Sequence, residues 1–283
     1  MKRPRTAPHT RTNIALEPIV PMRIGTAGYS YTDWREVFYP ADMQESDFLR
    51  FYSERFSCVE IDSTYYRIPG PSMFEAISKK VSEGFMFNVK VPSTFTHARD
   101  KFEQDLVPFK RSVQPIVDNG TLGCLVAQFP YSFKSSREGL EHIVKIKEGV
   151  ELPVVVEFRH VSWQKEDVYE FLQDHGIGYV NVDLPRIYGL PTPSQVVTSD
   201  VAYVRFHGRV DAKTWWEPEE AKQRYAYLYN EDELKEWVPH IRSIESKARN
   251  TYVVFNNHFR GFATQNAKMM RGIFSDEKEV GLS

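Results

Sequence analysis

The most constraining feature of this chain is a recurring pattern in which a short apolar run ends abruptly in polar residues. In VVVEFRHVSW, three valines typical of a buried strand are followed at once by Glu157, Arg159 and His160. The same pattern recurs at 58–67, 87–97, 125–130, 179–185, 203–208 and 252–258. Because the carboxyl ends of parallel strands lie at the same end of a sheet, the polar side chains that follow them come together there. The repetition therefore predicts a parallel barrel with a polar site at its carboxyl end.

Eight strand-like segments alternate with about as many amphipathic helices along the chain. The strands are expected at 23–27, 58–62, 85–91, 122–129, 153–158, 178–183, 202–206 and 252–255, and the main helices at 46–56, 71–81, 137–147, 166–173, 233–248 and 263–274. This α/β alternation over roughly 250 residues predicts a single-domain (β/α)8 TIM barrel. The alternative is an open doubly wound sheet, which ordinarily has fewer strands, and no glycine-rich dinucleotide-binding or P-loop turn is found.

Long loops are predicted after the third, sixth and seventh strands. Residues 96–119 are expected to form a loop and one broken helix, because Pro108 and Pro115 interrupt the helical pattern. Residues 184–199 contain too many prolines for a helix, and residues 208–234 form the longest insertion. The regular alternation of strands and helices is therefore interrupted at these three places.

The charge balance argues against a globally basic nucleic-acid-binding protein. The net charge is -2 and the pI is about 6.5, although these totals do not exclude a local basic patch. Residues 1–21 carry Lys2, Arg3, Arg5 and Arg11 before the first acidic residue, and they are predicted to be a disordered basic arm. We expect a TIM-barrel domain at 22–275 and a flexible tail at 276–283.

Cysteine usage and hydropathy predict the cellular location. Cys58 and Cys124 fall in apolar strand-like segments, which is typical of buried, reduced thiols in a cytoplasmic protein. No apolar run reaches the roughly 18–20 residues of a membrane span, and no secretion signal is recognised. We therefore expect a cytoplasmic protein without a membrane partner.

Alternation along the strands predicts which polar groups meet inside the barrel, since residues two apart share a face. Four such pairs are Asn88 with Lys90, Glu157 with Arg159, Asn181 with Asp183, and Arg205 with His207. The barrel mouth, where barrel enzymes keep their active sites, is also expected to include Glu60, Gln128 and either Asn256 or Asn257. The alternative is a structural salt-bridge network, because a buried charge needs a partner in either case.

The chemistry of these side chains suggests their roles. The predicted catalytic residues are Glu157 and Glu60 as an acid/base pair, and His97, His207 and Asp183. The predicted substrate-binding residues are Lys90, Arg159 and Arg205 for negative charge, Gln128, Asn256 and Asn257 as amides, and Trp34, Tyr65 and Trp163 as aromatic surfaces. The aromatic residues could equally be packing anchors. Schiff-base formation by Lys90 is less favoured, because nearby carboxylates would keep its amine protonated.

The sequence also contains candidate residues for an anion-binding site and for a metal-binding site. Arg260 and Gly261 precede the last predicted helix, whose N-terminus would attract phosphate or carboxylate; alternatively, Gly261 is only a turn. No HxH or HExxH motif supports a metal site, so no cofactor is predicted. A divalent ion remains an open alternative, with the candidate ligands Glu60, Glu157, Asp183 and His207.

Seven motifs occur in order along the chain. They are GTAGYSYTDW with FYP, VEIDSTYYRIP, FNVKVPSTFTH, QFPYSF, VVEFRHVSW, YVRFHG and YVVFNNHFRGFATQNA. Together they resemble the YecE-like family, domain of unknown function 72, from about Arg23 to Ile273. The resemblance implies a TIM barrel and no established activity. The family's motif positions correspond here to Gly25, Gly28, Trp34, Glu60, Tyr65, Lys90, His97, Gln128, Glu157, Arg159, Asp183, Arg205, His207, Gly208, Asn256 and Asn257.

The leading functional hypothesis is an enzyme that binds a small polar or anionic substrate, bearing phosphate or carboxylate, at the barrel mouth. It would use carboxylate and histidine acid/base chemistry, in a hydrolase or a lyase/isomerase type of reaction. An alternative is a nucleic-acid-binding barrel or metal-dependent phosphodiesterase, suggested by the carboxylates, the basic arm and the loop aromatics. A third hypothesis is a non-catalytic binding protein, because the fold alone does not choose a function.

Overall fold

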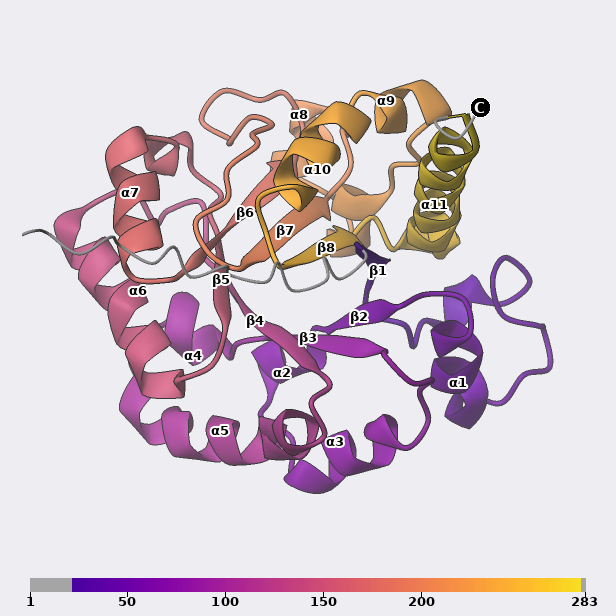
Figure 1. Cartoon of the computed structure of the whole chain (residues 1–283), viewed down its shortest axis with the longest axis horizontal. Coiled ribbons are helices and arrows are strands. Elements are labelled where there is room, and N and C mark those ends of the chain that lie inside the picture. Colours follow the sequence, from indigo (N-terminus) through magenta and orange to yellow (C-terminus); the bar gives the residue numbers. More distant parts are fainter. Residues whose placement is uncertain (1–21, 281–283) are drawn as a thin grey trace, which may run out of the picture.

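Eight parallel strands close into a barrel at the centre of the protein (Figure 1). The computed structural model describes residues 22–280, in which each strand pairs with its neighbours in sequence and β1 also pairs with β8. The strands are β1 (Arg23–Ala27), β2 (Cys58–Ile61), β3 (Met86–Lys90), β4 (Leu122–Gln128), β5 (Val154–Glu157), β6 (Gly178–Asp183), β7 (Val201–Phe206) and β8 (Asn250–Phe255). The predicted single-domain (β/α)8 barrel is confirmed.

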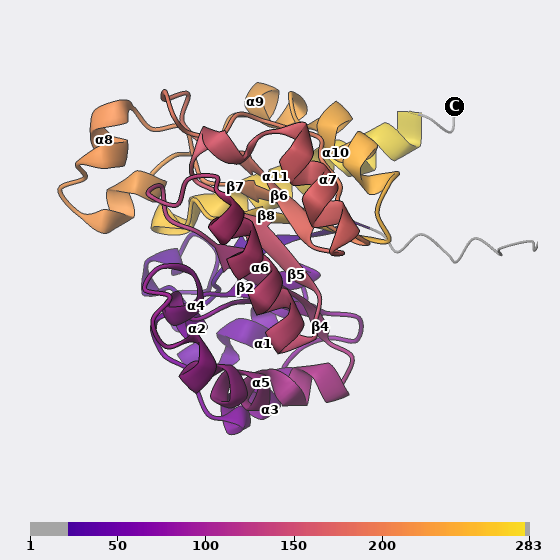
Figure 2. The same cartoon turned by 90° about the vertical axis from the view of Figure 1, so that its left-hand side faces the viewer.

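Helices surround the barrel and connect its strands. They are α1 (Phe48–Ser53), α2 (Ser63–Tyr66), α3 (Pro71–Ser78), α4 (Ser93–Thr96), α5 (Phe102–Asp118), α6 (Arg137–Val150), α7 (Glu166–Asp174), α8 (Ala212–Trp216), α9 (Glu231–Lys235), α10 (Val238–Glu245) and α11 (Phe262–Val280). The short helices α2, α4 and α8 follow β2, β3 and β7, and Figure 2 shows all three on the same side of the molecule. Within the described residues, no helix is long and apolar enough to cross a bilayer.

Two hydrophobic layers hold the barrel together. The larger layer lies between strands and helices, and strand residues such as Val59, Val156 and Val204 belong to it. The smaller layer fills the barrel interior and contains the side chains of Cys58 and Cys124. Because side chains alternate along each strand, this division identifies the residues that face inward.

The helix α5 corrects the prediction of a loop and a broken helix at 96–119. It runs unbroken from Phe102 to Asp118 with Pro108 and Pro115 inside it. Each proline frees one carbonyl of the preceding turn, on Gln104 and Arg111, and both of these residues are exposed, so that water can bond the carbonyls. Burial of the apolar face of α5 then outweighs the lost hydrogen bonds.

The helices near the C-terminal end also differ from their predicted bounds. The single helix expected at 233–248 is wrong, since α9 and α10 are separate there and Pro239 lies in the first turn of α10. Proline is favoured at a helix start because its missing N–H has no helical partner there. The helix α11 reaches Val280 and so extends into residues 276–283, which were predicted to form a tail. The basic arm predicted at 1–21 lies outside the described residues.

Candidate functional site at the barrel mouth

A buried network of charged side chains crosses the barrel interior and forms the floor of the mouth. The Arg205 guanidinium on β7 donates from Nη2 to Glu60 Oε1 on β2 at 2.5 Å, and from Nη1 to Glu157 Oε2 on β5 at 2.7 Å. The Tyr203 hydroxyl donates to Glu60 Oε2 at 2.8 Å. These four side chains are at most 1% exposed. One arginine therefore ties together three strands that are far apart in the sequence.

Glu157 has two further partners in this network. Arg159 Nε donates to Glu157 Oε1, and His207 Nε2 lies 3.1 Å from the same oxygen. Burial alone would raise the pKa of Glu157, but Arg159 and Arg205 hold it well below its ordinary value. Burial, together with Arg159, lowers the pKa of His207 to about 3. The neutral imidazole then donates to Glu157 from Nε2 and accepts at Nδ1 from Asn256 Nδ2, which is 3.0 Å away.

The pKa of Glu60 is shifted in the opposite direction to that of Glu157. Burial raises the pKa of Glu60 to about 8 in spite of Arg205, and the Asp62 carboxyl group contributes to the rise. Burial therefore prevails over the nearby guanidinium at Glu60, whereas the two guanidinium groups prevail over burial at Glu157. Asp62 was not among the predicted site residues, although it immediately follows β2.

A cavity of about 320 Å³ lies above this floor. Three of its lining side chains are cations, namely Lys90, Arg159 and Arg224, and no aspartate or glutamate of the described chain lines it. The other lining residues are Tyr65, Tyr66, His97, Gln128, Pro130, Tyr131, Leu190, Trp215, Trp216 and Tyr225. The cavity therefore has a positive lining and largely aromatic walls.

Lys90 and His97 lie beside the same aromatic ring at one wall of the cavity. Lys90 Nζ is 4.4 Å from the centroid of the Tyr65 ring, and the His97 ring meets Tyr65 edge to face at 5.0 Å. Burial lowers the pKa of Lys90, and so does the positive charge of Arg205. Burial, together with Lys90 and Arg159, lowers the pKa of His97 to about 4. His97 is therefore neutral at physiological pH and can accept a proton.

We expect the replacement Lys90→Met to raise the pKa of His97 above its value of about 4, although burial, Arg159 and Arg99 still lower it. Removing a neighbouring positive charge favours the protonated imidazole, so the shift must be upward. An NMR titration of the histidine ring nitrogens would measure it. His142 serves as the internal control, because its lowered pKa arises from burial and from charges other than Lys90. An unchanged His97 titration would contradict the proximity of the two charges.

The segment 208–230, which we call the roof segment, covers one side of the cavity. It contains α8 and the short 3-10 helix Ala221–Tyr225. Two guanidinium groups lie near the Trp215 ring, with Arg159 Cζ and Arg224 Cζ each 5.7 Å from its centroid. Trp216 meets Tyr131 edge to face at 4.8 Å. Cation–π and aromatic contacts therefore connect the roof segment to the barrel mouth.

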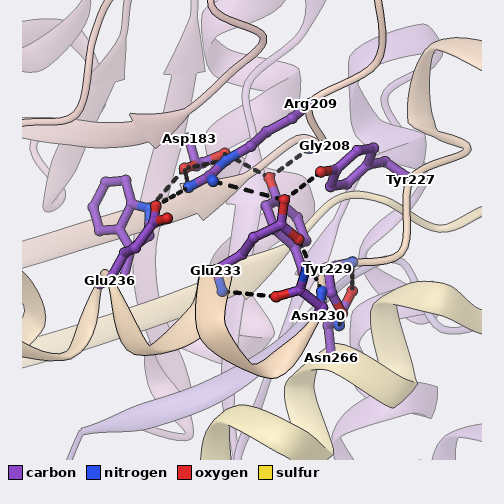
Figure 3. Close-up of polar contacts among 10 residues, drawn as sticks. Asp183, Gly208, Arg209, Tyr227, Tyr229, Asn230, Glu233, Glu236 and Asn266 are labelled. Atoms are coloured by element: carbon purple, nitrogen blue, oxygen red, sulfur yellow. Dashed lines mark hydrogen bonds and ion pairs between the residues drawn. The ribbon is translucent and has the colours of Figure 1, made fainter.

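A second polar network, centred on Asp183, anchors the roof segment (Figure 3). The buried Asp183 carboxylate accepts from Tyr229 Oη at 2.8 Å, Trp237 Nε1 at 2.7 Å and Arg209 Nη2 at 2.8 Å. The Tyr229 hydroxyl in turn accepts from the Gly208 backbone N–H at 2.8 Å. Both ends of the roof segment are thus fixed to the end of β6.

The predicted inward orientation of Asn181 and Asp183 is wrong. Their neighbours Val180 and Val182 belong to the interior layer, so Asn181 and Asp183 face outward. Asn181 Nδ2 donates to the Val196 carbonyl at 2.8 Å and so holds the loop between β6 and β7. The structure therefore separates Asp183 from the other predicted catalytic residues.

The two candidate asparagines after β8 also point to different sides of the barrel wall. Asn256 contacts His207 inside the barrel, as described above. Asn257 Nδ2 donates to the Tyr227 carbonyl and to Asn266 Oδ1, each at 2.8 Å, on the side of the helices. Asn256 is therefore the member of the pair that lies at the mouth.

Two of the three predicted aromatic surfaces are packing anchors instead. Trp34 is fully buried, and its Nε1 donates to the His258 carbonyl at 2.7 Å. Trp163 is also fully buried, stacks on Phe158 at 4.3 Å and donates from Nε1 to the Phe133 carbonyl at 2.6 Å. Of the three, only Tyr65 lines the cavity.

Arg260 lies outside the cavity, next to the start of α11. Its backbone N–H donates to Asp33 Oδ2 at 2.9 Å, and its side chain is exposed and lies against Phe259. Gly261 has a φ of +76°, and a Cβ atom there would come within 2.9 Å of Val37 Cγ1. This geometry fits the interpretation of Gly261 as a turn.

The four candidate metal ligands do not converge. Asp183 faces away from Glu60, Glu157 and His207, which are engaged with one another and with Arg205. Among residues 22–280, no three histidine, cysteine, aspartate or glutamate side chains are arranged to hold a metal ion.

Comparisons with known proteins assign the family of this barrel. A family model described as a protein of unknown function, DUF72, matches residues 23–282. This chain belongs to the DUF72 family. The UPF0759 protein YunF of Bacillus subtilis (strain 168) is 30% identical over 264 residues, which are 87% of this chain and 92% of YunF.

Solved structures of the DUF72 family share the fold. A crystal structure of a DUF72 family protein (TM1631) from Thermotoga maritima MSB8 has a TM-score of 0.83 at 37% identity, covering 90% of this chain and 99% of that one. A crystal structure of a DUF72 family protein (EF0366) from Enterococcus faecalis V583 has a TM-score of 0.80 at 26% identity, covering 90% and 96%. The family resemblance found in the sequence is confirmed.

Several residues of this DUF72 site were missed at the level of sequence. They are Asp62 and Tyr203 in the floor, and Tyr131, Arg224 and Tyr225 in the walls. Most of the wall residues come from the longest insertion, which follows a barrel strand. Its unusual content of aromatic and basic residues was the signal that could have identified them.

Proposed function

We propose that this DUF72 protein binds a small ligand carrying phosphate or carboxylate at the barrel mouth, as the first step of an enzymatic reaction. The observation that carries the proposal is a cavity lined by Lys90, Arg159 and Arg224 and by no carboxylate of the described residues. Burial strengthens the attraction of such cations for an anion, because little water competes with the ligand. Strand ends of this kind are also where barrel enzymes place their chemistry.

Within this proposal, His97 is the proton acceptor with the best access to a ligand. It lines the cavity, whereas Glu60 and Glu157 are fully buried in the floor and already bonded to Arg205. Two of the positive charges that lower the pKa of His97, those of Lys90 and Arg159, line the cavity, where an anion would neutralise them. Ligand binding would therefore raise the pKa of His97 and make it a stronger base.

The alternative functions receive less support from the same geometry. A nucleic-acid-binding protein spreads its cations along a surface to follow successive phosphates, whereas Lys90, Arg159 and Arg224 converge on one cavity. A non-catalytic binding protein would use the same ligand site. Turnover of a bound ligand would distinguish that alternative from the enzyme.

The proposal predicts that Lys90→Met weakens binding of inorganic phosphate by about 10-fold or more, since a charge-assisted contact contributes roughly 1.5–3 kcal/mol. Isothermal titration calorimetry at low salt would measure the dissociation constant. The matched control is Lys145→Met, which removes a lysine that also lies over an aromatic ring, Phe102, but outside the cavity. Equal affinity in the wild type and Lys90→Met, or no phosphate binding at all, would overturn the proposal.

A further inference from the structure

The cavity combines its cations with aromatic side chains that stay partly exposed to solvent. The Trp216 side chain is 41% exposed and Tyr66 is 83% exposed, although both line the cavity. Trp215, in contrast, is 4% exposed and has two guanidinium groups near its ring. Large aromatic side chains left partly in water around a concave site are typical of ligand-binding surfaces.

Polar groups suited to a sugar are scarce in the same walls. A sugar is usually held by carboxylates and amides that bond its hydroxyl groups, and Gln128 is the only amide side chain among the described lining residues. Gln128 Nε2 already donates to the Phe129 carbonyl at 2.8 Å. The walls instead offer flat, weakly polar surfaces from Tyr131 and Trp216, whose rings meet edge to face at 4.8 Å.

We infer that the ligand of this cavity is an aromatic anion, a planar ring that bears one phosphate or carboxylate group. The inference rests on the proposed anion-binding function and specifies its ligand class. The anionic group contacts Lys90, Arg159 and Arg224, and the ring packs against Tyr131 and Trp216. A volume of about 320 Å³ is at the lower end of small-molecule sites and suits a single ring.

Phenyl phosphate and cyclohexyl phosphate provide the test, because they carry the same charged group on rings of nearly equal size. The wild-type protein is expected to bind phenyl phosphate about 3- to 10-fold more tightly, the advantage that aromatic contacts confer beyond buried area. Trp216→Leu is expected to remove most of this preference and to leave the affinity for cyclohexyl phosphate nearly unchanged. Tyr188→Leu is the matched control, since Tyr188 is 99% exposed and does not line the cavity.

The outcomes separate this inference from the proposal on which it rests. Equal affinity for the two esters in the wild type would overturn the aromatic ligand and leave anion binding intact. A preference that survives Trp216→Leu unchanged would overturn the assigned ring position. Failure to bind either ester or inorganic phosphate would overturn both the inference and the proposed function.

Discussion

Arg205→Met is expected to lower the free energy of unfolding by about 3–5 kcal/mol, the usual cost of removing one partner of a buried ion pair. The Arg205 side chain is 1% exposed and bonds both Glu60 and Glu157. Methionine retains an unbranched apolar stem but is shorter and donates no hydrogen bond, so an ionised Glu157 would remain in the barrel interior with less compensation. The barrel would also lose the bridge between β2, β5 and β7.

Urea denaturation followed by tryptophan fluorescence would measure this loss. The matched control is Arg137→Met, which removes an arginine that pairs with Glu141 on the surface, where the two side chains are 91% and 64% exposed. Little change in the midpoint is expected there, because solvent screens an exposed pair. A similar small effect in Arg205→Met would show that the floor network does not stabilise the fold.

The strand pattern predicted most of the barrel floor correctly. Glu157 and Arg159 share the interior face, as their spacing indicated, because Val155 continues the same face inside the barrel. The barrel was predictable for the same reason, since an apolar run with a polar exit depends only on local sequence. The bounds of β1 and β6 agree with the predictions.

The orientation of β6 was not predictable by this reasoning. Both faces of a strand in a (β/α)8 barrel are buried, one in the interior and one under the helices, so polarity does not reveal which face points inward. In β6 the valines face the interior, whereas on the outer side Asn181 bonds the β6–β7 loop and Asp183 bonds Trp237 at the start of α10. Alternation correctly grouped the residues and could not decide between the two faces.

The position of the roof segment could not be predicted either, for a different reason. Its position depends on contacts between residues distant in sequence, such as Arg159 with Trp215 and Asp183 with Arg209. No local pattern encodes such a pair, and a long insertion has many conformations of similar local energy. How the roof segment completes the cavity wall therefore became visible only in the structure.

Asp183→Asn is expected to lower the free energy of unfolding by about 3 kcal/mol, because it breaks a buried ion pair. The Asp183 carboxylate accepts hydrogen bonds from Tyr229, Trp237 and Arg209, whereas an amide has one acceptor oxygen and an NH2 group that repels donors. Since this network anchors the roof segment, phosphate affinity is expected to fall several-fold as well. Urea denaturation and calorimetric titration with phosphate would measure the two effects.

The matched control is Glu236→Gln, because Glu236 pairs with the same Arg209 from an exposed position. Solvent screening should make that change nearly neutral for stability, and the roof segment should keep its phosphate affinity. If Asp183→Asn lowered stability but left phosphate affinity unchanged, the Asp183 network would hold α10 against the barrel without positioning the cavity wall. A joint loss of stability and affinity, absent from Glu236→Gln, would instead show that the outer face of β6 supports the mouth through the roof segment.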